Sequence, residues 1–186
     1  MPKTLFNENQ KVFNLNYLND PVSIERETKD NIIIGLNTPY LYIGSWRTSF
    51  AFHVEDFNLY SISYLHSGAP KTWYIIPPRY GKKFEKFSKD YLSFGFREAI
   101  KHKMFMPGPK TLRENQIGFG RIRQAASEFV VTFPYAYHGG FNNGLNIAEA
   151  INFGTEYWYR GEYIKSKKRC SCGQFNLSFK LAESKI

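Results

Sequence analysis

The chemistry-bearing residues of this chain begin in the stretch "FAFHVEDFN" at residues 50–58, where His53 and Glu55 stand two positions apart. Alternate side chains of a β-strand point to the same face, so this spacing predicts an imidazole and a carboxylate that project together. A second histidine, His138, lies far along the chain in another strand-like segment, "FPYAYHGGFN". If the two strands are neighbours, the three side chains meet.

Two imidazoles and one carboxylate form a facial triad, which leaves open positions on an octahedral ferrous ion. Zinc accepts the same ligands, so the residue types alone leave the metal open. The competing interpretation is that His53 and His138 are ordinary hydrogen-bonded histidines, because a lone His-x-Glu is a weak motif.

Lys71 is the fourth residue of interest, because it is an isolated cation ahead of the apolar run "TWYII". A buried ammonium needs a partner, and its own strand offers no obvious acidic one. A cosubstrate carboxylate would meet that need. An iron ion together with a dicarboxylic oxo-acid is the chemistry that uses all four residues.

The elements that must position these residues are mostly strands. Alternating or continuous apolar runs predict strands within 31–44, 49–56, 59–66, 71–78, 122–134, 136–144 and 145–155. Two helical segments are expected between them, at 78–92 and 96–105. This order predicts a mainly β protein, an antiparallel sandwich or barrel that carries a helical insert.

Composition narrows the class of protein. A length of 186 residues suits one domain. The formal net charge of +9 favours polyanions such as DNA or chromatin, although a solvated basic surface explains it equally well. Apolar runs long enough for a transmembrane span or a signal peptide are missing, so no membrane partner is expected.

Basic residues cluster in two parts of the chain. "KSKKRC" is a weak nuclear-import motif, and two cysteines spaced Cys-x-Cys at its end favour a reducing compartment or a metal. Non-specific contact with nucleosomal DNA is expected from Lys82, Lys83, Lys86, Lys89, Lys101, Lys103, Lys167, Lys168 and Arg169.

Long stretches of the chain resemble the JmjC catalytic domain of histone lysine demethylases, most closely the jumonji-domain-2 subfamily. The matching segments are "GLNTPYLYIGSWRTSFAFHVEDFNLYSISYLHSGAPKTWYIIPP", "HKM" and "FVVTFPYAYHGGFNNGLNIAEAINFGT". The resemblance implies a double-stranded β-helix (jelly-roll or cupin-like), Fe(II) and 2-oxoglutarate. It also implies that residues 1–186 are a single JmjC domain, with 160–186 as a candidate zinc-binding segment.

The resemblance assigns roles by position. His53, Glu55 and His138 would be the iron ligands, and Lys71 would pair with the far carboxylate of 2-oxoglutarate. Phe50 and Trp73 would line the cosubstrate pocket. The positions that shape the methyl-lysine pocket or guide dioxygen are Gly35, Tyr40, Tyr42, Asn152 and Lys103. Without the resemblance, sheet packing is the better explanation of the tyrosines.

Four departures from the family pattern stand out. Ser63 occupies the position of an asparagine that helps to hold 2-oxoglutarate, and a shorter side chain predicts weaker binding. A cosubstrate-contacting tyrosine and the JmjN segment of the family lie upstream of the region that this chain matches, so the chain looks shortened. Ala150 and Ile151 replace the Ser-Thr pair found beside the methyl pocket in many members.

The remaining departure concerns a structural zinc site of the subfamily. His102, Cys170 and Cys172 match three of its four ligands, but Phe96 occupies the fourth position and cannot bind a metal. Structural zinc is normally closed and four-coordinate. Zinc is therefore a candidate here, with a metal-free Cys-x-Cys as the alternative.

The resemblance implies a nuclear dioxygenase that demethylates tri- or dimethyl-lysine in the tail of histone H3. Ala-Ile at 150–151 is implied to favour lysine 9 over lysine 36. Methyl hydroxylation would be followed by release of formaldehyde, with succinate as the second product. Two alternatives remain: a protein hydroxylase of the same superfamily, and a JmjC chromatin-binding module that has lost turnover.

Overall fold

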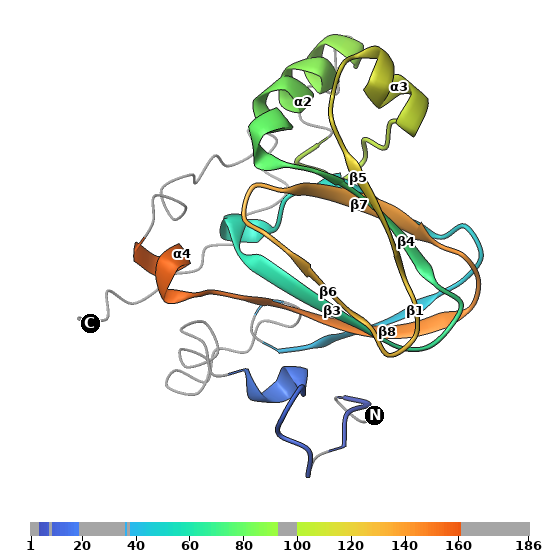
Figure 1. Cartoon of the computed structure of the whole chain (residues 1–186), viewed down its shortest axis with the longest axis vertical. Coiled ribbons are helices and arrows are strands. Elements are labelled where there is room, and N and C mark those ends of the chain that lie inside the picture. The colour runs from blue at the N-terminus through green and yellow to red at the C-terminus, as the bar shows by residue number, and fades with distance from the viewer. Residues whose placement is uncertain (1–3, 8, 19–35, 37, 93–99, 161–186) are drawn as a thin grey trace.

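A computed structural model describes residues 4–7, 9–18, 36, 38–92 and 100–160. Its body is two four-stranded sheets that face each other, with the helices α2 (Pro78–Tyr91) and α3 (Pro109–Glu114) at one end (Figure 1). In the described part of the chain, the paired strands of both sheets are antiparallel. The predicted mainly β fold with a helical insert is confirmed, and the architecture is that of a jelly roll.

The first sheet, which we call sheet I, has the order β1-β8-β3-β6. Its strands are β1 (Tyr40–Gly44), β8 (Asn146–Phe153), β3 (Tyr60–Gly68) and β6 (Phe129–Thr132). Sheet II has the order β2-β7-β4-β5. Its strands are β2 (Ser49–His53), β7 (Tyr137–Asn142), β4 (Lys71–Ile76) and β5 (Gly120–Gln124).

The two faces of sheet II have different chemistry, as the two-residue period of a strand requires. Phe52 and Ile76 are fully buried on the outer face. They form a hydrophobic core with Tyr137 of β7 and with Phe84 and Leu112 from the helices α2 and α3. His53 follows Phe52 directly, and Trp73 precedes Ile76 by three positions, so both side chains point to the opposite face of the sheet. There they line a cavity between the two sheets.

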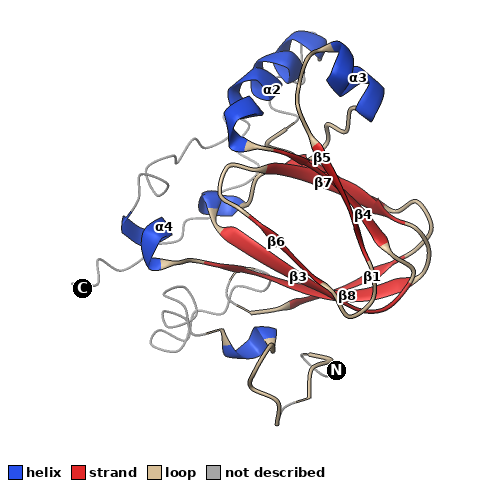
Figure 2. Cartoon of the chain, viewed as in Figure 1, coloured by secondary structure: helices blue, strands red, loops and turns tan. Residues whose placement is uncertain are grey.

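The helices α2 and α3 pack on the outer face of sheet II (Figure 2). The amphipathic helix predicted at 78–92 is α2 (Pro78–Tyr91), which begins with proline at its first position, a favoured helix start. The helix predicted at 96–105 is not found in the described part of that stretch, because 100–103 form a turn in which Lys103 has φ +54°. The short α3 (Pro109–Glu114) follows instead.

The single strand expected at 122–134 is two strands, β5 and β6, separated by a turn. The Glu128 carboxylate accepts a hydrogen bond from the backbone N–H of Ala125 at 2.7 Å, and the Glu128 N–H donates back to the Ala125 carbonyl at 3.3 Å. This turn carries the chain from sheet II to sheet I.

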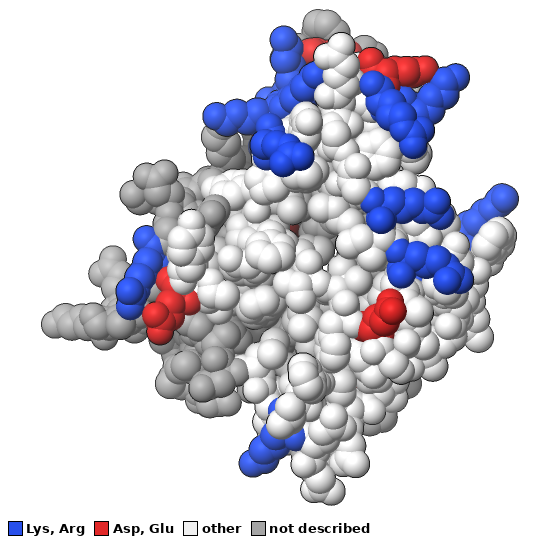
Figure 3. All heavy atoms as spheres, viewed as in Figure 1, with Lys and Arg blue, Asp and Glu red and all other residues white. Residues whose placement is uncertain are grey.

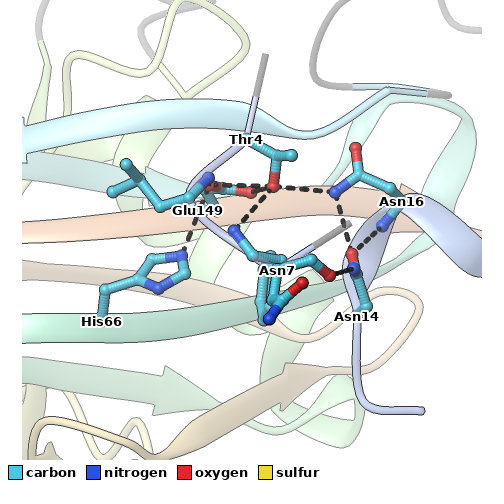
Figure 4. A network of polar contacts seen from close by, with 8 residues as sticks. Thr4, Asn7, Asn14, Asn16, His66 and Glu149 are labelled. Carbon is cyan, nitrogen blue, oxygen red and sulfur yellow. Dashed lines mark hydrogen bonds and ion pairs between the residues drawn. The ribbon is translucent and has the colours of Figure 1, made fainter. Parts of the chain in front are cut away.

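The N-terminal segment packs against sheet I on the side away from the cavity. It contains the 3-10 helix η1 (Leu15–Tyr17). Thr4 donates its hydroxyl hydrogen bond to the carboxylate of Glu149, at 2.9 Å, and the backbone N–H of Leu5 binds the same carboxylate (Figure 4). Glu149 is fully buried, and His66 Nε2 lies 3.4 Å from it.

Two short helices complete the described elements: η2 (Asp56–Asn58), directly after β2, and α4 (Glu156–Arg160), after β8. Among the described residues, no helix has the length and apolar character that crossing a membrane requires.

Candidate active site

The predicted triad comes together in the structure. One ligand atom from each of His53, Glu55 and His138 lies within 4.8 Å of the other two. The two histidines are direct partners across the β2–β7 pair, with ring centroids 4.4 Å apart. A register irregularity between Phe50 and His53 marks the end of β2.

Glu55 reaches the triad in a different way from the one predicted. The strand β2 ends at His53, so Glu55 stands two residues beyond it, in an extended conformation (φ −66°, ψ 153°) ahead of η2. Because the backbone stays extended through Glu55, its side chain still projects beside His53 as the strand period predicts.

The histidine tautomers leave lone pairs that converge. His53 Nδ1 lies 2.8 Å from the carbonyl of Ala51, and His138 Nδ1 lies 3.0 Å from that of Ala136. A ring nitrogen that faces a carbonyl donates its hydrogen, so in the neutral form of each ring Nε2 carries the lone pair. His138 Nε2 faces Glu55 Oε1 at 3.2 Å, which is favourable only with a proton or a cation between them.

The electrostatics of the cluster suit a cation. Burial, and then the charge of His138, lower the pKa of His53 to about 4, so this ring is neutral at physiological pH. Burial acts to raise the pKa of Glu55, but the hydrogen bond from His138 and the neighbouring histidine charges outweigh it and hold that pKa well below its usual value. A neutral imidazole and an ionised carboxylate are the forms that bind metal.

Lys71 lies at the other side of the same cavity. Its side chain is only 7% exposed. Nζ is surrounded by the rings of Tyr42, Phe50 and Trp73, at 5.7, 5.8 and 5.8 Å from their centroids. Burial lowers the pKa of Lys71 to about 8. Within the described part of the chain, no carboxylate forms an ion pair with this ammonium group. The charge of Lys71 is therefore available to bind an anionic ligand in the cavity.

The aromatic wall between Lys71 and the triad depends on a glycine. The Phe50 and Trp73 rings meet edge-to-face at 4.9 Å. Gly140 of β7 pairs with both residues, one on each side. A Cβ at Gly140 would stand 2.1 Å from the Thr72 carbonyl and 2.7 Å from the Phe50 ring, so only glycine fits under this wall.

Gln124 holds the Trp73 ring in place through a hydrogen bond. Its side chain is fully buried and accepts a hydrogen bond from Trp73 Nε1 at 3.0 Å. Its amide donates to the backbone carbonyls of Ser63 at 3.1 Å and Glu128 at 2.9 Å. One side chain on β5 therefore links the cavity wall of sheet II to the backbone of sheet I.

The cavity has a volume of about 570 Å³. The predicted site residues that line it are His53, Glu55, His138, Lys71, Phe50, Ser63, Trp73, Tyr40, Tyr42, Ala150, Ile151, Asn152 and Lys103. Its remaining lining residues, which sequence reasoning missed, are Leu36, Ile43, Gly44, Thr48, Ser49, Asp56, Phe57, Ser61 and Asn142.

Asn142 is the clearest of the missed residues. It is the register partner of Lys71 and is 8% exposed. Its amide donates to Thr48 Oγ1 at 2.9 Å, and its Oδ1 accepts from Asn146 Nδ2 at 3.0 Å. The polar run "GGFNNG" inside a strand-like segment marks this position in the sequence, because buried amides need partners.

The described residues expected at the substrate end all line the cavity. Tyr40 and Tyr42 pack with ring centroids 4.9 Å apart, and both are about half exposed. Burial and then the charge of Glu55 raise the pKa of Tyr42, which keeps its hydroxyl protonated. Lys103 is exposed at the cavity mouth, and its charge contributes to the lowered pKa of His53.

Several predicted positions lie outside the described residues: Gly35, Phe96, Cys170, Cys172, Lys167, Lys168 and Arg169. His102 is described and partly buried. The candidate zinc site therefore stays a prediction.

The comparisons with known proteins agree with this geometry. Residues 40–153 match the family model described as "JmjC domain, hydroxylase". The chain is 46% identical over 181 residues to lysine-specific demethylase 4D of Rattus norvegicus, covering 96% of this chain and 35% of that protein. It is 45% identical over 181 residues to the probable lysine-specific demethylase 4F of Homo sapiens, covering 96% and 28%.

A third relative, lysine-specific demethylase 4B of Mus musculus, is 49% identical over 152 residues, which is 80% of this chain and 14% of that protein. The chain thus spans about a third or less of the length of these curated relatives. The family match covers well over half of the chain and contains the whole triad, Lys71 and both sheets, and on this ground the chain belongs to the JmjC domain family.

Proposed function

We propose that this chain is the catalytic core of an Fe(II)- and 2-oxoglutarate-dependent histone lysine demethylase. The main support for this proposal is that one cavity contains both a cluster of metal-binding side chains and a separate buried cation. Three metal-binding side chains converge at one side, and a buried lysine without a carboxylate partner in the described chain lies at the other. The demethylase names of the relatives support the same function.

His53, Glu55 and His138 would hold the iron through Nε2 and carboxylate oxygens, since both Nδ1 atoms face backbone carbonyls. When bound, iron supplies the oxidation of a substrate C–H bond by dioxygen, coupled to decarboxylation of 2-oxoglutarate to succinate. Lys71 would orient the far carboxylate of 2-oxoglutarate by charge. Phe50 and Trp73 would exclude water and keep the dicarboxylate extended between Lys71 and the triad.

The substrate we propose is tri- or dimethyl-lysine in the tail of histone H3. A trimethylammonium group has no N–H donor, so it suits a rim of rings and small side chains. Tyr40, Tyr42 and Asn152 would shape this rim, together with Gly35. Ala150 and Ile151 would make it more apolar than a Ser-Thr pair and favour lysine 9 over lysine 36. Lys103, at the cavity mouth, would help to guide dioxygen.

A nuclear location follows from a histone substrate and stays part of the proposal. So does structural zinc on His102, Cys170 and Cys172, although Phe96 leaves that ligand set one short of the usual four.

One observation favours a second candidate, a chromatin-binding module with weakened turnover. Ser63 is 5% exposed and lines the cavity where a longer amide would reach the cosubstrate. A protein that retains the methyl-lysine rim but binds 2-oxoglutarate poorly would bind the peptide without converting it.

Mass spectrometry of a histone H3 peptide trimethylated at lysine 9 tests the proposal. The peptide is incubated with the protein, ferrous iron, 2-oxoglutarate and ascorbate, with His138→Ala as the blank. Stepwise loss of one methylene mass, with formaldehyde, is expected only with the unaltered triad. A gain of one oxygen mass identifies a hydroxylase instead. Unchanged peptide that still binds to a folded, metal-loaded protein supports the binding module and overturns the demethylase.

The preference for lysine 9 is tested in the same assay with a peptide trimethylated at lysine 36. Ala150→Ser combined with Ile151→Thr is expected to raise turnover of the lysine 36 peptide relative to the lysine 9 peptide. An unchanged ratio removes these two residues from the explanation of specificity.

A further inference from the structure

The helix α2 has one face made of basic side chains. After Arg79, the other four basic residues of α2 lie three, four, seven and ten positions along the helix. Because an α-helix turns by about 100° per residue, all five side chains fall within a sector of roughly 120°. The buried residues Gly81, Phe84 and Ser88 lie on the opposite side of the helix, against the core. The five exposed residues are Arg79, Lys82, Lys83, Lys86 and Lys89.

The basic face continues onto α3. Lys83 Nζ donates to the backbone carbonyl of Gln116, just after α3, at 3.1 Å. This contact joins the outer side of α2 to the end of α3, which carries the exposed Lys110 and Arg113. The two helices therefore present their basic side chains side by side.

The same surface extends onto the edge strand of sheet II. The guanidinium of Arg113 lies over the Phe119 ring, 5.5 Å from its centroid, and Phe119 packs edge-to-face on Tyr74 at 6.0 Å. Tyr74 is the register partner of Arg121 in the β4–β5 pair. Arg121 and Arg123 are both exposed and share one face of β5. Contacts thus run without a break from α2 to β5.

We call these nine residues the basic face: Arg79, Lys82, Lys83, Lys86, Lys89, Lys110, Arg113, Arg121 and Arg123. Figure 3 shows Lys and Arg side chains gathered at the helical end of the molecule. The same three elements carry three acidic residues, of which Glu85 accepts a hydrogen bond from Tyr137 at 2.9 Å and Glu114 lies 3.9 Å from Lys110. Nine cations against three anions leave a strong excess of positive charge.

We infer that the basic face binds the phosphate backbone of double-stranded DNA. An extended row of cations over two helices and a strand edge fits a polyanion whose charge is spread along its length. An acidic peptide docks best in a groove, and the cavity of this chain is lined by none of these nine residues. A surface that reads single strands offers free aromatic rings for stacking. Here the Tyr80 and Phe119 rings lie under Arg79 and Arg113.

The biological meaning of this contact rests on the proposed function, because a histone tail emerges beside DNA. The basic face and the cavity share no residue, so one protein can engage both at the same time. Phosphate contacts carry no sequence information, and the face is expected to set position and affinity rather than target sequence.

The test is fluorescence anisotropy with a labelled random-sequence duplex over a series of salt concentrations. The variant is Lys82→Glu with Lys86→Glu, which reverses two exposed charges on α2. Its matched control, Lys11→Glu with Arg160→Glu, makes the same change in net charge at exposed positions off the face. Loss of about two phosphate contacts is expected to reduce the slope of log Kd against log salt by about two. The α2 variant is expected to bind at least about tenfold more weakly at 0.1 M salt, and the control less than about threefold.

Equal losses in the variant and the control would attribute binding to net charge alone and overturn the inference. Equally tight binding of a polyglutamate peptide would overturn the choice of DNA. Turnover of the free histone peptide is measured in parallel for both variants. If the unaltered protein converts the peptide but does not bind the duplex, the inference about the basic face fails and the proposed demethylase function stands. If it binds the duplex but does not convert the peptide, the proposed function fails and the inference stands.

Discussion

At the scale of single residues, the buried charge of Lys71 lowers the stability of the fold, although the proposed function needs that charge to bind 2-oxoglutarate. The unfolded chain holds this proton with a pKa of 10.5, whereas burial lowers the pKa to about 8. Below pH 8 the amine is charged in both states, so the full penalty for burying the charge is present. Between these two values the folded protein has lost a proton that the unfolded chain keeps, so the penalty shrinks as the pH rises.

Replacing Lys71 with methionine is therefore expected to stabilise the protein while abolishing 2-oxoglutarate binding. The difference between the two pKa values corresponds to a gain of at most about 3 kcal/mol in the free energy of unfolding near neutral pH. The loss of the contacts between the ammonium group and three aromatic rings reduces this gain. Urea unfolding across the pH range measures the gain, which should fade as the solution approaches the unfolded pKa. A variant that is less stable at every pH contradicts the assignment of Lys71 as an uncompensated charge.

If the proposed function holds, Ser63→Asn is expected to strengthen the binding of 2-oxoglutarate. One added neutral hydrogen bond corresponds to about a threefold to tenfold lower KM for 2-oxoglutarate, with kcat changed much less. Steady-state kinetics measures this, with Ser67→Asn, an exposed position on the same strand, as the control. An unchanged KM shows that the space at residue 63 does not limit cosubstrate affinity.

At the scale of elements, the edge strand β5 contributes to the site without lining it. Gln124→Met removes an acceptor from Trp73 Nε1 and a donor from the carbonyls of Ser63 and Glu128, of which the Glu128 carbonyl keeps a hydrogen bond from the Leu65 N–H. Groups left unpaired in this way cost about 1–3 kcal/mol each, so a loss of at least about 2 kcal/mol in the free energy of unfolding is expected. Urea unfolding measures it, with the exposed Gln10→Met as control.

A second variant separates a role in the cavity wall from general packing. Trp73→Phe removes the indole N–H, so combining it with Gln124→Met should cost less than the sum of the two single changes. Full additivity would show that Gln124 does not act through Trp73.

The elements also show where sequence reasoning succeeds. Alternating or continuous apolar runs predict β2, β3, β4, β7 and β8, because a strand buried on one or both faces needs apolar side chains there. The i, i+2 spacing of His53 and Glu55 survives even though the strand ends at His53, since only an extended backbone is needed. Lys71 is found because a charge inside an apolar run demands a partner.

What could not be predicted depends on backbone conformations and side-chain hydrogen bonds that a hydrophobic pattern does not encode. The break at Ala125–Glu128, inside the stretch 122–134 that is expected as a strand, is fixed by a hydrogen bond from a backbone N–H to the Glu128 carboxylate, which no hydrophobic period reveals. The 96–105 helix is absent from the described residues because Lys103 takes a left-handed conformation. In the sequence Gln124 is an ordinary polar residue of a strand. Its role follows from its hydrogen bond to the Ser63 carbonyl of β3, which is distant in sequence.

At the scale of the whole molecule, metal binding and folding should be coupled. Manganese(II), which accepts the same ligands without oxidative chemistry, is expected to stabilise the protein by about 2.7 kcal/mol at a hundred times its Kd. For a chain of this size that is a rise in Tm of roughly 5–10 °C. Differential scanning calorimetry measures the shift, and a chelator should reverse it.

Two histidine variants make this prediction specific. His138→Ala should lose the shift. His66→Ala, a histidine outside the triad, should lower the starting Tm and yet keep the shift. A shift that survives in His138→Ala places the metal elsewhere.

The carboxylate of Glu149 has a consequence for where the folding unit begins. The family match starts at residue 40, but the fully buried acid at 149 takes its hydrogen bonds from Thr4 and Leu5. A recombinant fragment cut at the start of the family match keeps every predicted catalytic group and leaves this carboxylate with His66 alone among these partners. The shortest fragment that folds well is therefore longer than the recognisable domain, and its limits are set by a hydrogen bond across 145 residues of sequence.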